Sequence, residues 1–134
     1  MRRLALFVCM SMALSAQAHE GCFQNPQLAV ILIAFQARQA TEAQKEESRY
    51  WEAARQSNPE AKALIDAAEA ISEGGRKRYC EAVAAPHAAG PMQPAIQWEC
   101  EARWSRSSMR RIWVDFLRSA TPPSTLPEPI FVAP

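Results

Sequence analysis

The chain is poor in the residues on which many enzymes and metal proteins depend. It has only 2 histidines and 4 glycines among 134 residues. Neither histidine belongs to a nucleophile motif with serine or cysteine, and no glycine-rich phosphate loop occurs. The cysteines also lack the close spacing of redox-active or zinc-binding pairs. The sequence therefore predicts a protein that is not an enzyme and that has neither a cofactor nor a metal site.

An excess of positive charge is missing as well. Lysine and arginine number 15 and aspartate and glutamate 14, which gives a net charge of +1. A general nucleic-acid binder carries a strong basic excess, so we expect no nucleic-acid partner. The longest apolar run, Leu4–Leu14, is shorter than the roughly 20 residues that a membrane-crossing helix needs. We therefore expect no stable membrane span.

The beginning of the chain has the three parts of a secretory signal. Arg2 and Arg3 supply the positive charge, Leu4–Leu14 supplies the apolar segment, and Ala16–Ala18 supplies small residues at the cleavage site. We predict that residues 1–18 form a signal peptide and that the mature protein begins at His19. The predicted location is periplasmic or secreted.

Cleavage at this point changes the charge and the cysteine count. Removing Arg2 and Arg3 leaves 13 basic and 14 acidic residues, a net charge of −1, and removing Cys9 leaves three cysteines. Residues 19–73 contain nine acidic and five basic residues, whereas residues 74–134 contain five and eight. We expect these two halves to attract each other as faces of one bundle.

The mature sequence predicts an all-α fold, because good helix formers dominate and no period-2 alternation occurs. Asn25 and Pro26 are a capping residue and a first-turn proline, which predict the start of the first helix. A second helix is predicted from Pro59. Gly74-Gly75 either ends that helix or lies where another helix approaches closely. The helix-forming residues that follow favour continuation to about Ala84.

The end of the chain contains a proline-rich loop, a third helix and a tail. Pro86–Pro94 is predicted to be a loop, and a third helix should run from near Pro94 to about Ala120. The tail, residues 121–134, has five prolines and few charges, so we predict disorder. The predicted organisation is a signal peptide (1–18), a small three-helix bundle (19–120) and this tail.

The three mature cysteines suggest one intramolecular bridge. Cys80 is predicted near the end of the second helix and Cys100 near the start of the third. If these helices fold back antiparallel, the two sulfurs meet at the base of the hairpin, and an exported protein meets an oxidising environment. We therefore predict a Cys80–Cys100 disulfide. Cys22 is left as either a free thiol or the link of a disulfide-bonded homodimer.

Two helical segments are candidates for binding a partner. Residues 28–35 are apolar nearly all round and belong either to the core or to a partner interface, with Leu28, Ile31 and Phe35 as the candidate contacts. The third helix alternates arginine with tryptophan, including Trp104 and Trp113. We expect these tryptophans in the core with the arginines in solvent, the alternative being contact with an anionic membrane surface or an acidic partner.

The second half also carries a pattern that a known family shares. An arginine lies one turn before a cysteine, a glycine-containing loop follows, and a second cysteine opens the last helix. The positions concerned are Arg76, Cys80, Gly90, Met92 and Cys100. Over roughly residues 70–117 the chain thus resembles the lysozyme inhibitor LprI-like family. Ser72 and Ser108 depart from the pattern, standing where the family has tryptophan and arginine, and Cys22 has no neighbouring cysteine.

The resemblance implies an envelope-located helical module that inhibits lysozyme in some members. Lysozymes are basic, so an inhibitor is expected to present acidic complementarity. We therefore expect an exported, non-catalytic binding protein whose partner is a protein, with lysozyme as the candidate. The alternative is a structural or assembly partner in the bacterial envelope that binds through the apolar first helix.

Overall fold

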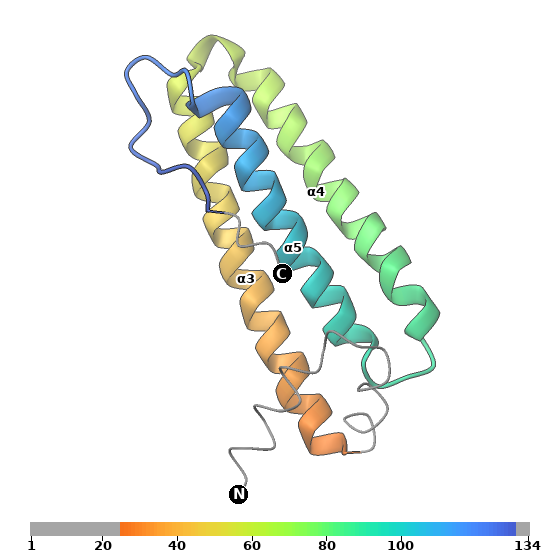
Figure 1. Ribbon diagram of the computed structural model, residues 1–134. Coiled ribbons are helices and arrows are strands. Elements are labelled where there is room, and N and C mark those ends of the chain that lie inside the picture. The colour runs from red at the N-terminus through yellow and green to blue at the C-terminus, as the bar shows by residue number, and fades with distance from the viewer. Residues whose placement is uncertain (1–24, 131–134) are drawn as a thin grey trace, which may run out of the picture.

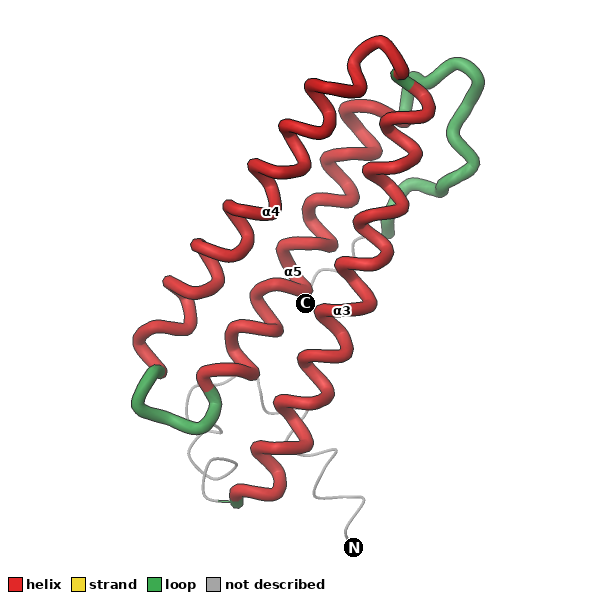
Figure 2. Tube along the Cα trace, turned by 180° about the vertical axis from the view of Figure 1, so that it is seen from behind, coloured by secondary structure: helices red, strands yellow, loops and turns green. Residues whose placement is uncertain are grey.

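The computed structural model describes residues 25–130, which form three long helices. These are α3 (Pro26–Ser57), α4 (Lys62–Ala84) and α5 (Gln93–Ile112), and α5 lies between the other two in both views (Figures 1 and 2). α3 and α5 run parallel, and α4 runs antiparallel to both. No strand occurs within the described residues. The predicted all-α fold with three helices is confirmed. The predicted signal peptide, Cys22 and residues 131–134 lie outside the described range.

Local signals define where the helices begin and end. The Asn25 side chain accepts a hydrogen bond of 3.1 Å from the Gln27 backbone N–H, as expected for an N-cap. A 3-10 turn, Pro59–Ala61, precedes α4, so the second α-helix starts slightly later than the proline signal predicts. A second 3-10 turn, Ala85–His87, opens the loop before α5, and a π-helical turn, Trp113–Leu117, ends α5.

The α4 helix runs through Gly74 and Gly75 without a break, so the predicted continuation is confirmed. The reason is a close contact at the second glycine. A β-carbon added at Gly75 would lie 3.3 Å from the Trp104 ring, which is tighter than an ordinary van der Waals contact. Glycine therefore allows the indole of α5 to pack against the backbone of α4.

Small residues let α3 and α5 approach each other along their whole length. The buried small side chains at this interface are Ala29, Ala40, Ala43, Ala95, Ala102, Ser105 and Ser108. A larger core lies toward the end of the bundle where α3 ends, and its buried members are Tyr50, Trp51, Ala54, Ile65, Met109, Ile112 and Leu117. The bundle is thus built mainly on the α3–α5 pair, with α4 packed against α5.

The described part of the tail, residues 121–130, turns back toward α3 (Figure 1). The Tyr50 hydroxyl donates a hydrogen bond of 2.9 Å to the Pro127 carbonyl, and Leu126 packs against the larger core. Burial, with a smaller contribution from Glu46, raises the pKa of Tyr50. The phenol therefore stays a hydrogen-bond donor to the tail. The predicted disorder concerned all of residues 121–134, of which the last four are not described.

Most ion pairs connect neighbours rather than the two halves of the chain. Arg55 pairs with Glu52 on its own helix and with Asp66 and Glu69 on α4. Hydrogen bonds from Lys62 and Arg55 hold the pKa of the Asp66 carboxyl below its usual range. These carboxylates are therefore already neutralised by cations of the same half. Attraction between the two halves, which the charge distribution predicted, is seen mainly in the pairs of Arg76 described below.

Candidate functional site

The disulfide joins the two helices for which it was predicted. Cys80 on α4 and Cys100 on α5 are bonded, with their α-carbons 5.5 Å apart. Both side chains are buried. The bridge supports a location in which disulfides persist, which is an oxidising compartment.

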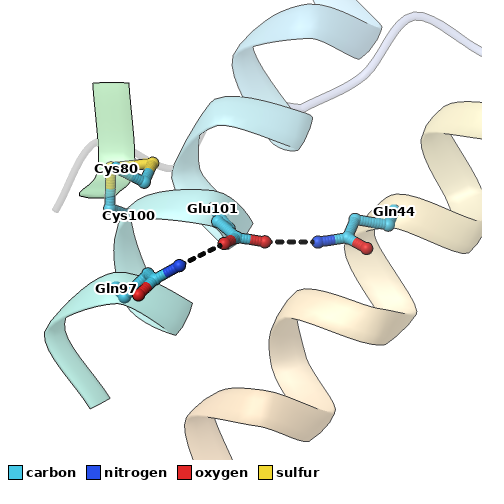
Figure 3. The surroundings of a disulfide bond; sticks show 5 residues. All are labelled: Gln44, Cys80, Gln97, Cys100 and Glu101. Carbon is cyan, nitrogen blue, oxygen red and sulfur yellow. Dashed lines mark hydrogen bonds between the residues drawn. A yellow bond between two sulfur atoms is a disulfide. The ribbon is translucent and has the colours of Figure 1, made fainter. Parts of the chain in front are cut away.

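A buried carboxylate lies one residue beyond this bridge and joins α5 to α3 (Figure 3). The Glu101 carboxylate accepts hydrogen bonds of 2.9 Å from the Gln44 amide on α3 and 3.2 Å from the Gln97 amide on α5. The disulfide and this carboxylate together tie α5 to both of its neighbours at one level of the bundle. Because both oxygens of Glu101 are occupied by amides within the fold, the arrangement is structural.

A second buried carboxylate connects α3 to α4. The Glu47 side chain, 4% exposed, accepts a hydrogen bond of 3.3 Å from Arg76, whose side chain is 15% exposed. It also accepts one of 3.4 Å from the Trp51 indole N–H. Glu47 is thus engaged on both oxygens by groups of the fold. Sequence reasoning missed both buried glutamates, because they lie in stretches of polar residues with no sign of burial.

The three candidate contacts of the first helix are only partly covered. Leu28 is half-buried, whereas Ile31 is 48% and Phe35 40% exposed. Val30, which the sequence did not single out, is 66% exposed. The opposite side of this stretch packs against Met92 and Ala95. We call Val30, Ile31 and Phe35 the α3 apolar strip, and the structure leaves it open to solvent within the described residues.

The predicted core position of the two α5 tryptophans is met only in part. Trp104 and Trp113 are both half-buried. Trp104 lies against Gly75 and beside Tyr79, with a ring-centroid distance of 5.6 Å to the tyrosine. The Arg111 guanidinium lies 5.6 Å from the centroid of the Trp104 ring. Trp104 therefore forms part of a surface rather than a sealed core. The sequence gives no indication of Tyr79 as its neighbour.

The described residues hold no feature suited to a metal or a membrane span. His87 lies exposed in the turn before α5. No group of three histidine, cysteine, aspartate or glutamate side chains in residues 25–130 could hold a metal ion. Across this range no helix combines the length and apolar character that crossing a bilayer requires.

The chain was also compared with known proteins. The scan against protein-family models, the search of curated proteins and the search of solved structures each find no match.

Proposed function

We propose that this chain is an exported, non-catalytic protein that acts by binding another protein. The observation that carries the proposal is the α3 apolar strip, in which Val30, Ile31 and Phe35 remain exposed at one end of a long helix. Exposed apolar side chains gathered on one surface are typical of protein interaction sites. The predicted signal peptide supplies the route of export, and the Cys80–Cys100 bridge suits an oxidising destination.

The resemblance to LprI-like domains adds lysozyme as the candidate partner. The residues that carry it have structural roles in this fold. Arg76 pairs with Glu47, Cys80 and Cys100 form the bridge, and Met92 is buried against the start of α3. These roles support a shared helical scaffold, while the proposed inhibition rests on the resemblance itself.

The first prediction concerns lysozyme directly. The mature protein with its disulfide intact is expected to slow the clearing of a cell-wall suspension by lysozyme, with an effect that saturates as the protein is added. The measurement is the initial rate of turbidity loss. Ile31→Asp should reduce the inhibition if the apolar strip makes the contact, because burying an unpaired carboxylate is costly. An unchanged clearing rate at micromolar excess of the wild-type protein would remove lysozyme as the partner.

The second candidate function is a structural or assembly role in the envelope through the same strip. It predicts that the wild-type protein captures one specific envelope protein, and that the purified partner binds again in isolation. The double variant Ile31→Asp/Phe35→Asp should abolish this binding. Leu64→Asp is the matched control, because Leu64 is exposed on α4, away from the strip. Equal loss with the control, or full retention in the double variant, would exclude the strip as the binding surface.

A further inference from the structure

A second surface, separate from the α3 apolar strip, lies along α5 beside the end of α4. It is an open groove of about 690 Å³, within the range of ligand-binding sites. Its apolar lining includes Tyr79, Trp104 and Val114, and its charged lining includes Arg103, Arg111 and Asp115. Residues 103, 107, 111 and 114 recur at helical spacing, which places them on one side of α5. We call this hollow the Trp104 groove.

The floor of the groove is aromatic and its side is cationic. Tyr79, which is 58% exposed, stands beside Trp104, and Arg111 covers part of the indole ring. An arginine over an indole leaves its N–H groups directed outward, where they can bind an oxygen anion in a bidentate manner. The groove therefore offers an apolar seat next to donors for carboxylates.

The charge of this surface is not balanced by the fold. Arg103 and Arg111 make no ion pair within residues 25–130. By contrast, cations on α3 and α4 are paired with carboxylates, namely Arg38, Arg49, Arg55, Lys62 and Arg76. The one acidic side chain that lines the groove is Asp115. The groove thus combines excess positive charge with exposed aromatic surface.

We propose that the Trp104 groove binds an acidic peptide segment of a partner protein. An apolar or aromatic side chain of that segment occupies the space between Tyr79, Trp104 and Val114, and its carboxylates pair with Arg103 and Arg111. The concave shape favours a peptide over a lipid surface. A flat bilayer would reach the exposed arginines but would leave the aromatic floor uncovered. This site goes beyond the proposed function, since it lies on another part of the molecule and needs a partner of opposite character to basic lysozyme.

The test uses the mature, disulfide-bonded protein and a fluorescein-labelled peptide in which glutamates surround two phenylalanines. Fluorescence anisotropy should show saturable binding that weakens as salt is added. The double variant Arg103→Glu/Arg111→Glu should weaken binding by about tenfold or more, since like charges repel at the contact. Arg106→Glu is the matched control: it makes the same change on the same helix, at an exposed position that does not line the groove. It should change affinity less than about twofold.

Three additional measurements distinguish peptide binding at the groove from misfolding, from attraction without charge preference and from membrane binding. The single variant Arg103→Gln, at an exposed position, serves if the double variant fails to fold by circular dichroism. A peptide with lysine in place of glutamate should not bind. Vesicles of phosphatidylglycerol, compared with phosphatidylcholine vesicles, report on a membrane role. No binding of the acidic peptide, equal loss with Arg106→Glu, equal binding of the lysine peptide, or arginine-dependent binding to anionic vesicles alone would each overturn the proposal.

Discussion

Replacing Glu47 with alanine is expected to lower the free energy of unfolding by about 3–5 kcal/mol, the usual cost of removing one partner from a buried ion pair. The Glu47 carboxylate is the acceptor for both Arg76 and the Trp51 indole. Without it, a nearly buried guanidinium and a buried N–H lose their partner at the junction of α3 and α4. Urea unfolding followed by circular dichroism, with the midpoint and slope compared between variants, measures the loss.

Two variants test the cause of this loss. Glu47→Gln keeps the shape and an acceptor oxygen, so it should cost less than Glu47→Ala. Replacing both partners, in Glu47→Met/Arg76→Met, should recover much of the stability, because no buried charge is then left unpaired. Glu42→Ala is the control at an exposed pair, with Arg38, and should cost at most about 1 kcal/mol. If Glu47→Ala cost no more than Glu42→Ala, the buried pair would not be important for stability.

The helices could be predicted from the sequence because their boundaries are encoded locally. Asn25 with Pro26 starts α3, and the prolines between residues 86 and 94 interrupt the helical pattern before α5. The predicted bridge followed from the same information. Once the second and third helices form a hairpin, Cys80 and Cys100 lie close together at its base. Each of these inferences needs only residues that are near in sequence or one turn of the chain away.

The continuation of α4 through its glycines was harder to predict, because its cause lies on another helix. Gly75 is adjacent to the Trp104 ring, and no pattern around residue 75 identifies that neighbour. The first helix presents the same difficulty. Residues 28–35 are apolar on nearly every side, so the sequence cannot tell which side faces Met92 and Ala95 and which remains exposed.

The charge distribution was a poor guide to contacts between elements. The acidic excess of the first half suggested attraction to the basic second half, but local partners occupy several of those carboxylates. Arg38 and Arg49 pair with glutamates three or four residues away, as helical spacing allows. Arg103 and Arg111 on α5 consequently have no ion-pair partner in residues 25–130. A sum of charges over half the chain does not contain this information, which depends on each side chain's position on its helix.

Removing the Cys80–Cys100 bridge is expected to lower the free energy of unfolding by about 3 kcal/mol, as chain-entropy theory gives for a closed loop of this length. The two cysteines are 20 residues apart in sequence. The broken bond frees the hairpin in the unfolded state, and the native state loses the covalent link that holds α4 to α5. Urea unfolding of the double variant Cys80→Ser/Cys100→Ser, compared with the oxidised parent protein, measures the effect. Single-domain proteins have only about 5–15 kcal/mol of stability in total, so the change should be evident.

The matched control is Cys22→Ser, which leaves the bridge intact and should keep the stability of the parent. A reducing agent should lower the midpoint of the parent and of Cys22→Ser by equal amounts, while leaving the double variant unchanged. If reduction had no effect on the parent, the bridge would be dispensable for the fold. If the predicted loss is found, the stability of this bundle depends on an oxidising compartment. The disulfide then connects the predicted signal peptide to the folded state, because the protein reaches full stability only after export.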